Sequence, residues 1–215
     1  MTERPCFVVG EDNLIREPLI KFNWVSGLAF SQRVKCAESL ARAIKEELPN
    51  AAHLEISSKS RTELGKSLSA FNLLLDGLSL ESVYHSSKVY EDGTQFEFLK
   101  NETAKFSKRF MRENGYSHGE LVKFRLNKKD YPKTPRNAFY DWIYINSLIQ
   151  SKVSNEVLEY NAFTDIEFNH KKNINCQAQA LALYVAIKKS KKENYYFQSF
   201  DNFLKAYDEY FVIKK

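Results

Sequence analysis

Residues 79–88 hold a carboxylate, an imidazole and an amine close together in the chain. Ser79 is a suitable helix N-cap and no Gly or Pro interrupts the next turns, so the sequence predicts a helix that starts here. In that helix Glu81, His85 and Lys88 stand at positions i, i+4 and i+7, which share one face. A row of this kind is a candidate for general acid and base catalysis.

The same spacing also has a structural explanation. An acidic residue in the first helical turn is favoured by the helix dipole, and Glu four residues before His can be an ordinary surface pair. The spacing alone leaves both explanations open.

Further polar residues extend the candidate site. By residue type they suit the cleavage of a glycosidic bond or the handling of a sugar phosphate: a carboxylate can act as acid or base, and an amine can attack an anomeric carbon once the sugar ring opens. The small hydroxyl residues and Asn around Phe71 equally suit a turn that satisfies its own backbone. The wider set is Lys59, Ser69 to Asn72, Glu81, His85, Lys88, Asp165, Asn175 and Gln177.

Other kinds of site lack their signatures. The sequence has no Gly-rich phosphate motif, no zinc-ligand spacing and no nucleophile elbow, and its four histidines are scattered, so we expect neither a metal nor a cofactor. The three cysteines are widely spaced without a CxxC pair, as expected for reduced thiols in a cytoplasm. No signal-like run and no stretch of about 18 apolar residues occurs, so we expect a soluble cytoplasmic protein without membrane contact.

The composition fits one large domain, or one domain with an appended terminal piece. Hydrophobic residues make up 43% and aromatic residues 14% of the 215 residues, which is enough for a substantial core. Only 7 Gly and 5 Pro argue against a sandwich of many tight turns. The net charge of +5, from 32 basic and 27 acidic residues, tolerates a polyanionic partner without requiring one.

The hydrophobic pattern predicts several helices and strands around these residues. Helices are expected over 31–48, capped by Ser31, and over 96–114, ended by Gly115. Nearly continuous apolar segments predict buried helices over 136–144 and over 178–187, and Asp141 in the first is either a paired structural carboxylate or a site residue. Alternating residues predict strands over 53–57 and 122–126, and residues 200–211 form an amphipathic helix for the protein body or a partner.

The helix over 96–114 carries a basic stripe. Its residues follow at i, i+3, i+4 and i+7, a spacing that could lie along DNA phosphates or could simply be a solvated face. The stripe consists of Lys105, Lys108, Arg109 and Arg112.

Several short motifs follow one another along the chain, and their combined order is a more specific family signal than any single motif. They are Glu55-Ile56-Ser57-Ser58-Lys59-Ser60, Leu64-Gly65, Leu68-Ser69-Ala70-Phe71-Asn72-Leu73, the row from Glu81 through Tyr84 to Lys88, Ala138-Phe139-Tyr140-Asp141-Trp142, Phe163-Thr164-Asp165-Ile166-Glu167-Phe168-Asn169, and Ile174-Asn175-Cys176-Gln177-Ala178. On these motifs, which span roughly residues 5 to 190, the chain resembles the NADAR (YbiA-like) family, and most closely its branch of DarT-toxin-associated antitoxins.

The resemblance implies a mainly α fold with a few short strands, of the α+β class. It implies an N-terminal strand and helix extension over 1–50 that packs on the main domain, a NADAR-like catalytic domain over 51–190, and a C-terminal amphipathic helix over 191–215.

The resemblance also implies an activity. The protein would be an antitoxin N-glycosidase, a hydrolase that removes ADP-ribose from guanine bases of DNA and so reverses a DarT-type ADP-ribosyltransferase toxin. Its partners would be ADP-ribosylated DNA, ADP-ribose as product, and the cognate toxin.

By motif position, Glu81 matches the family's catalytic glutamate and Asp165 its aspartate, while Lys59 and Lys88 match lysines that would meet the distal ribose. The family's mid-domain Trp has no equivalent between Lys105 and Arg112, and Trp142 is its candidate substitute. The expected substrate-binding residues are Ser58, Ser69, Phe71, Asn72, Tyr84, Trp142, Asn175 and Gln177.

Three alternatives stay open at this point. Related family members are implicated in N-glycosidic cleavage of riboflavin-pathway intermediates. An antitoxin can instead sequester its toxin, here through an exposed aromatic tail formed by Tyr195, Tyr196, Phe197 and Phe200. The basic stripe could also make the protein a DNA binder without catalysis.

Overall fold

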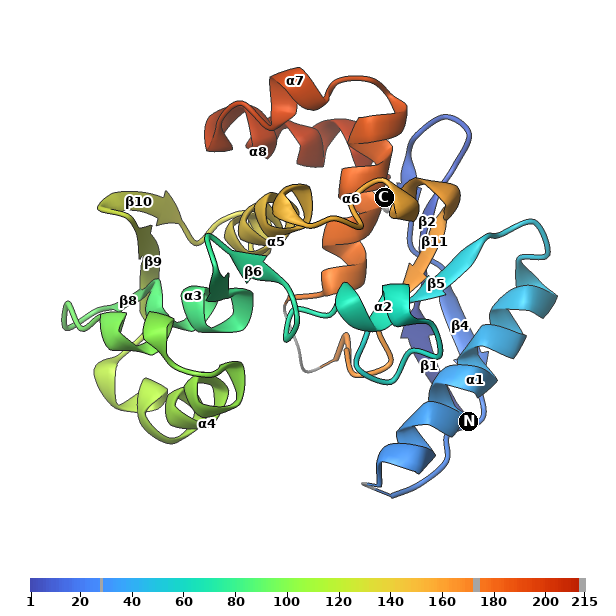
Figure 1. The fold of residues 1–215 in the computed structure, drawn as a ribbon, viewed down its shortest axis with the longest axis horizontal. Helices are drawn as coiled ribbons and strands as arrows, with labels where there is room; N and C mark the ends of the chain where they lie inside the picture. Colours follow the sequence, from blue (N-terminus) through green and yellow to red (C-terminus); the bar gives the residue numbers. More distant parts are fainter. Residues whose placement is uncertain (28, 172–174, 213–215) are drawn as a thin grey trace. The chain divides into compact units, whose positions relative to one another are not determined.

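The computed structural model describes residues 1–27, 29–171 and 175–212, and the chain forms two compact units (Figure 1). The first unit combines residues 1–69 with 153–215, and the second is residues 70–152. Helical residues outnumber strand residues, which confirms the expected mainly α, α+β fold. The division at residues 50 and 190 stays a prediction, and Ile174 of the last motif lies outside the described residues.

Two small sheets form in the first unit. β1 (Thr2–Pro5) pairs antiparallel with β4 (Leu19–Phe22). The larger sheet has the order β3 (Ile15–Arg16), β2 (Phe7–Val9), β11 (Ala162–Thr164) and β5 (His53–Glu55). β11 runs parallel to β5, with Thr164 opposite Glu55. This register continues past the strands, since the Ile56 amide donates to the Thr164 carbonyl at 2.7 Å.

Helix α1 (Phe30–Glu47) packs against β4 and β5 of the same unit. Its buried residues Leu40 and Ile44 join a core with Cys6 and Ile20. The helix is confirmed, but its cap is not Ser31: Ala29 is the N-cap, and its amide donates to the Gln32 side chain at 3.2 Å. The long side chain of Gln32 reaches back across the first turn, which makes the serine unnecessary.

The remaining helices of the first unit lie mostly in the C-terminal segment. Helix α6 (Gln177–Lys189) is nearly all buried, as its apolar sequence predicts. Helix α8 (Phe200–Tyr210) packs on α6 and on α7 (Glu193–Tyr196) through Phe203 and Ala206. The amphipathic helix therefore covers its own unit. The short helices α2 (Glu63–Ser67) and η3 (Glu156–Glu159) complete this unit.

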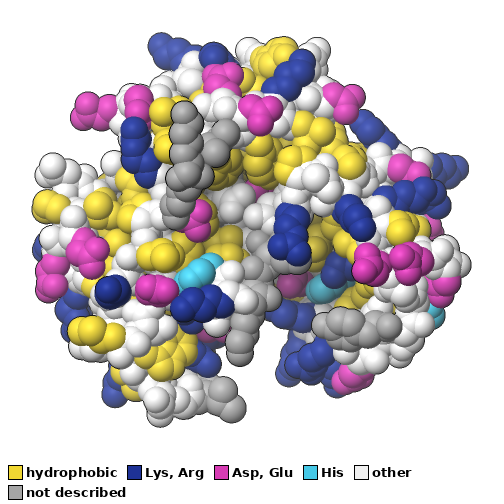
Figure 2. Space-filling model, turned by 180° about the vertical axis from the view of Figure 1, so that it is seen from behind, with side chains coloured by type: hydrophobic (Ala, Val, Ile, Leu, Met, Phe, Trp, Pro, Cys, Tyr) yellow, Lys and Arg dark blue, Asp and Glu magenta, His cyan; other side chains and the backbone are white. Residues whose placement is uncertain are grey.

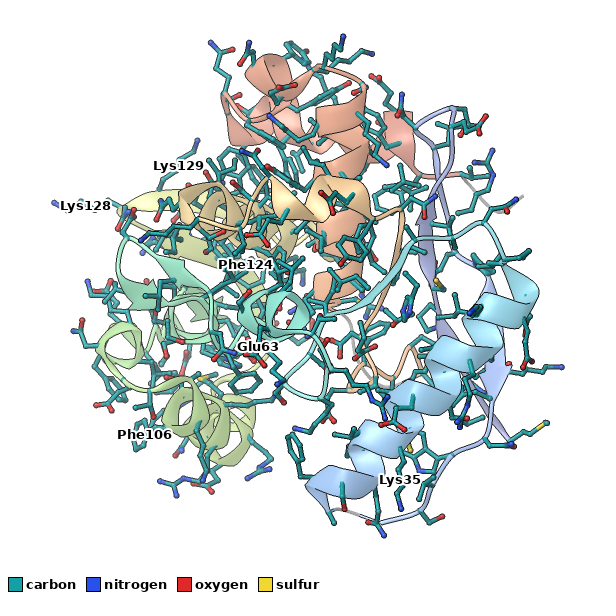
Figure 3. The ribbon with its side chains drawn as sticks, turned by 45° about the vertical axis from the view of Figure 1, so that its right-hand side comes forward. Lys35, Glu63, Phe106, Phe124, Lys128 and Lys129 are labelled. Atoms are coloured by element: carbon teal, nitrogen blue, oxygen red, sulfur yellow. The ribbon has the colours of Figure 1, made fainter. Side chains whose placement is uncertain are left out.

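The second unit is built on a three-stranded antiparallel sheet. Its order is β10 (Lys129–Pro132), β9 (Leu121–Leu126) and β8 (Lys88–Tyr90). Phe124 of β9, labelled in Figure 3, packs in a core with Val83 and Phe139, and Phe139 belongs to the buried helix α5 (Ala138–Gln150). Asn127 and Lys128 have positive φ angles of 50° and 64° and close the β9–β10 hairpin, as in a type I′ turn.

The predicted helix over 96–114 is broken. It consists of η1 (Glu97–Asn101) and α4 (Ala104–Asn114), because the Thr103 hydroxyl accepts the Phe106 amide at 3.2 Å and caps a new helix. Gly115 ends α4 as predicted. The second unit also contains β6 (Leu74–Leu75), β7 (Leu78–Ser79) and η2 (Gly115–His118).

Helix α3 (Leu80–Ser86) begins directly after Ser79, as predicted, but it ends before Lys88. The hydroxyls of Ser86 and Ser87 both donate to the Val83 carbonyl, at 3.0 and 2.7 Å, and close the last turn. The chain then enters β8, where Lys88 pairs with Phe124 of β9. The expectation that Lys88 lies on the helical face is therefore wrong.

Charged side chains of both signs are mixed over the face shown in Figure 2, in line with the similar counts of 32 basic and 27 acidic residues. Within residues 1–27, 29–171 and 175–212, no helix has both the length and the apolar content of a membrane span.

Candidate active site

The second unit gathers a group of charged residues around Glu81. We call Glu81, His85, Lys88 and Lys108 the Glu81 group. Helix α3 supplies the first two, β8 supplies Lys88 and α4 supplies Lys108. Helices α3 and α4 are held together by hydroxyls, since Ser107 donates to the Ser82 hydroxyl at 3.1 Å and Ser82 donates to the Glu102 carbonyl at 2.8 Å.

Glu81 is a buried carboxylate with cationic neighbours. It is only 9% exposed, and its Oε1 lies 3.7 Å from Lys108 Nζ and 3.9 Å from His85 Nε2. Burial raises the pKa of Glu81, while the charges of Lys108 and Lys88 oppose this rise. Glu81 is therefore a carboxyl whose pKa depends on its cationic neighbours as well as on its burial.

His85 connects Glu81 with Lys88. Burial and the nearby charges of Lys88 and Lys108 lower the pKa of His85 to about 3, so its ring is neutral at pH 7. Its Nδ1 lies 3.3 Å from Lys88 Nζ and accepts a hydrogen bond from the ammonium, so the ring proton sits on Nε2. Within the described part of the chain, Nε2 has no hydrogen-bond partner.

Lys88 is the lysine whose chemistry is altered most clearly. Burial lowers its pKa to about 8, against the opposing charge of Glu81. A neutral amine is therefore more accessible here than on an ordinary lysine, and only the neutral amine is nucleophilic.

Two aromatic rings border the Glu81 group. Lys88 Nζ lies 4.7 Å from the centre of the Tyr84 ring, and Lys108 Nζ lies 5.0 Å from that of Phe71. Phe71 is 45% exposed, so its ring offers a face on which a nucleobase can stack.

A second polar group, with two carboxyls and one carboxamide, lies in the first unit, where Asp165 directly follows β11. We call Glu55, Asp165 and Gln177 the Asp165 group. Asp165 Oδ1 accepts the Glu167 amide and Oδ2 accepts Gln177 Nε2, both at 2.9 Å. Gln177 also donates to the Ile56 carbonyl at 2.6 Å. The start of α6 therefore holds the aspartate beside the chain that leaves β5.

Glu55 braces both neighbours of Asp165. Its carboxylate accepts the Thr164 hydroxyl at 2.6 Å and the Ile166 amide at 2.8 Å, and it also accepts the Ser57 hydroxyl at 2.7 Å. Burial raises the pKa of Glu55. Burial and the nearby Glu55 charge raise the pKa of Asp165 to about 8. Asp165 therefore carries a proton at neutral pH.

The burial of Glu55 beside Asp165 is a feature that the sequence pattern missed. On the predicted half-buried strand Glu55 counted as one of the polar, solvent-facing neighbours of Leu54 and Ile56. The strand instead pairs in parallel with β11, and strands in parallel pairing are often buried on both faces. The signal that could have found it is the polar run from Glu55 to Lys59, which is one of the family motifs.

The other predicted residues of the first unit have local partners. Lys59 Nζ donates to the Ser58 hydroxyl at 2.6 Å and lies 4.8 Å from the centre of the Phe30 ring. Ser69 is buried, and Asn175 is half-buried just before α6. Their substrate contacts stay predictions.

In the second unit, Tyr84 and Phe71 lie beside the Glu81 group, whereas Asn72 is exposed and Trp142 packs partly buried against the core around Phe139. The substrate roles of Asn72 and Trp142 stay predictions. All residues of the basic stripe are exposed on α4, and one of them, Lys108, belongs to the Glu81 group. DNA contact by Lys105, Arg109 and Arg112 also stays a prediction.

The expected aromatic tail is largely internal. Tyr196 and Phe200 are each only 3% exposed, because they pack within the first unit, while Tyr195 is 44% exposed. The expectation of a continuous exposed aromatic surface is wrong. The described residues contain no group of three or more His, Cys, Asp or Glu side chains arranged to hold a metal ion.

Comparison with known proteins gives one family. The profile of the family described as DarT1-associated NADAR antitoxin matches residues 2–215. The match includes the first strands and the C-terminal helix, which lie outside the minimal NADAR pattern. No curated protein matches the chain.

Proposed function

Because the chain belongs to the family of DarT1-associated NADAR antitoxins, we propose that it is an N-glycosidase that removes ADP-ribose from guanine bases of DNA. It would thereby reverse a DarT-type ADP-ribosyltransferase. The observation that carries the proposal is the Glu81 group, in which a buried carboxyl, a neutral imidazole and the amine of a half-buried lysine lie beside aromatic rings.

Glu81 is the general acid and base of the proposed reaction. The bond to be cleaved joins the anomeric carbon of ADP-ribose to the exocyclic amino nitrogen of guanine. Protonated Glu81 gives its proton to this nitrogen as the carbon–nitrogen bond breaks. Water then adds its oxygen to the anomeric carbon, and the proton that it loses returns to Glu81. The products are ADP-ribose and unmodified guanine.

A lysine has one of two roles in this proposal. Either it binds phosphate, or its neutral amine adds to C1 of the ring-opened ribose that still carries guanine. A proton then passes from the lysine nitrogen to the guanine nitrogen, and guanine leaves as the lysine imine forms. Water hydrolyses this imine to give ADP-ribose and the free amine. The pKa of Lys88, lowered to about 8, favours Lys88 as the attacking amine, and Lys59 is the alternative from the family motifs. Borohydride added during turnover should trap a covalent adduct on Lys88. An adduct on Lys59 would reassign the role, and no adduct would leave direct hydrolysis by water.

Asp165 supports the reaction as a proton-bearing carboxyl. With a pKa of about 8 it donates a hydrogen bond at neutral pH, which suits a ribose hydroxyl. Gln177 and Glu55 hold it in place through the contacts described above.

Glu81→Gln tests the proposal, because Gln is nearly isosteric but transfers no proton. A positioned acid or base contributes about 10²–10⁴-fold in rate, so the variant should lose about this factor in kcat. The assay measures ADP-ribose released from an oligonucleotide with one ADP-ribosylated guanine. The matched control is Glu113→Gln, an exposed glutamate on α4 of the same unit, which should keep wild-type turnover.

Circular dichroism and thermal unfolding would establish that both variants are folded. Turnover by Glu81→Gln within a few fold of the wild type would remove Glu81 from the mechanism. If this variant hydrolyses nothing yet still protects cells from the toxin, the protein acts by sequestration instead.

A further inference from the structure

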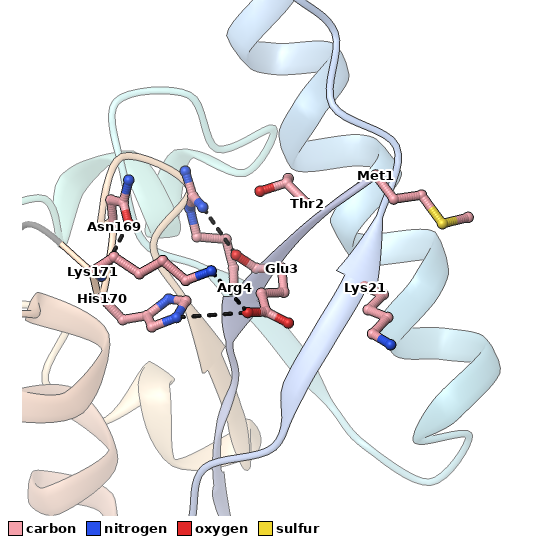
Figure 4. A pocket seen from close by; sticks show the side chains of 8 residues that line it. All are labelled: Met1, Thr2, Glu3, Arg4, Lys21, Asn169, His170 and Lys171. Carbon is pink, nitrogen blue, oxygen red and sulfur yellow. Dashed lines mark hydrogen bonds and ion pairs between the residues drawn. The ribbon is translucent and has the colours of Figure 1, made fainter.

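A pocket lies in the first unit, lined by residues other than those of the Glu81 and Asp165 groups. It has a volume of about 440 Å³, within the range of small-molecule sites (Figure 4). Strand β1 contributes Glu3 and Arg4, β4 contributes Lys21, and the loop that follows Asp165 contributes His170 and Lys171. Neither the sequence motifs nor the proposed reaction uses these side chains.

Arg4 is an unusual cation. It is only 7% exposed, and a guanidinium has five N–H donors. Within residues 1–27, 29–171 and 175–212, one hydrogen bond uses them, from Nη1 to the Glu3 carbonyl at 2.9 Å. Its Nε is buried without a hydrogen-bond partner, and no carboxylate of the described residues forms an ion pair with it. A buried charge of this kind is unfavourable unless a group of opposite charge pairs with it.

The surroundings of Arg4 add to this need for an anion. Arg4 and Arg33 both lie over the ring of Trp24, at 5.0 and 4.6 Å from its centre. Burial and the charge of Arg33 lower the pKa of Arg4, while Asp165 opposes this from a distance beyond ion-pair contact. The charge of Arg33 therefore repels that of Arg4, which makes a bound anion more favourable here.

The rest of the pocket is also positively charged. Lys21 and Lys171 are exposed at its rim, and Glu3 is the one acidic residue among the described residues that line it. Glu3 already faces Lys171 at 3.3 Å and His170 at 3.9 Å. Figure 4 shows these two contacts converging on one Glu3 oxygen, with Lys21 on the neighbouring strand. The lining thus contains three cationic side chains, Arg4, Lys21 and Lys171, and the one carboxylate of Glu3. Nδ1 of His170 is buried and has no hydrogen-bond partner among the described residues, so it is a further potential donor.

We propose that this pocket binds a phosphate group of the substrate, with Arg4 as its buried anchor and Lys21 and Lys171 at its rim. The planar guanidinium matches phosphate oxygens in pairs, and lysines add point charges. The inference rests on the proposed function for the identity of the substrate. A phosphate here has two sources: the DNA strand that carries the modified guanine, or the diphosphate of ADP-ribose.

Direct binding separates these sources and does not depend on turnover. The probes are an unmodified single-stranded oligonucleotide and free ADP-ribose, titrated by calorimetry or fluorescence anisotropy over a range of salt concentrations. The main variant is Lys21→Ala/Lys171→Ala, since both side chains are exposed and their removal does not threaten folding. Arg4→Gln is the second variant. The control is Lys45→Ala, an exposed lysine in the last turn of α1 outside the pocket.

We expect the double variant to bind one probe at least tenfold more weakly, and Lys45→Ala to match the wild type. If the oligonucleotide is affected, the slope of log affinity against log salt should also become shallower, by about 0.7 for each single-strand phosphate that the variant no longer neutralises. An effect on ADP-ribose alone assigns the pocket to the diphosphate.

Unchanged affinity for both probes in the double variant and in folded Arg4→Gln would overturn the inference. Wild-type protein that binds through this pocket but releases no ADP-ribose from modified DNA would refute the proposed function and leave the phosphate site standing.

Discussion

The two units bury acidic side chains in opposite electrostatic surroundings. In the first unit, the half-buried Asp165 lies near the buried carboxyl of Glu55, and desolvation and like charge both raise the pKa of Asp165, to about 8. In the second unit, Glu81 lies near Lys88 and Lys108, whose charges oppose the effect of burial. The first arrangement keeps Asp165 protonated at neutral pH. The second places the Glu81 carboxyl near Lys88, an amine whose pKa is lowered.

This difference shows that burial alone does not define the role of a carboxyl. The neighbours decide whether its proton is held or exchanged. The comparison also predicts that the two units respond to pH in separate windows, which variants of each group can test.

The largest expected effect belongs to Asp165→Asn. The folded-state pKa of about 8 lies above the ordinary value of 3.8, so the folded state binds more protons between these pH values. Wild-type stability from this group is therefore present below pH 3.8 and is lost as the pH rises to about 8, by at most about 1.4 kcal/mol per pH unit. Asp165→Asn should remove this slope in urea unfolding measured from pH 4 to 8. Asp201→Asn, exposed on α8, should keep it, and identical slopes in both variants would contradict the comparison.

Lys88→Met should change the pH dependence of stability at higher pH than Asp165→Asn does, with the opposite sign and a smaller total effect. The folded-state pKa of about 8 lies below 10.5, so the unfolded state binds more protons between these values and wild-type stability rises with pH there. The limit is again about 1.4 kcal/mol per pH unit, over a narrower range. Met fills a similar volume without a charge, so the variant should lose the rise between pH 8 and 10.5. Lys100→Met, exposed in η1, is the control, and a rise that persists in Lys88→Met would show that Lys88 is not the titrating group.

Lys108→Met gives the smallest expected change. Its loss removes a charge that favours ionised Glu81, so the pKa of Glu81 should rise further. The pH profile of kcat should therefore shift to higher pH. Lys108 is 60% exposed, and exposed pairs contribute about 0.2–1 kcal/mol, so kcat at neutral pH should change by less than about fivefold. Lys105→Met, one turn earlier on the same helix, should leave the pH profile of kcat unchanged. Equal shifts in both variants would show that the summed positive charge on α4, and not Lys108 in particular, sets the pKa of Glu81.

Local signals predicted the parts of the site that local chemistry controls. Ser79 marks the start of α3, and the uninterrupted residues after it place Glu81 and His85 on one face. The Asn175 segment opens α6, which delivers Gln177 to Asp165. Each of these features depends on residues close together in the sequence.

Features set by distant pairing could not be predicted in the same way. The end of α3 before Lys88 depends on pairing with β9, more than thirty residues further along the chain. The burial of Glu55 depends on β11, with Thr164 opposite it at a separation of 109 residues. Lys108 is by sequence one member of a solvated stripe, and only the packing of α4 on α3 brings it to Glu81. The break at Thr103, by contrast, has a local signal, because threonine is a common capping residue.

The two tryptophans of the chain are divided between the two units, Trp24 in the first and Trp142 in the second. Each unit thus contains its own intrinsic fluorophore, and replacing one indole with Phe leaves an emission signal from the other unit alone. Trp24 lies under two guanidinium groups, so its emission senses the local field directly. Optical spectroscopy without any attached dye can therefore follow each half of this molecule separately.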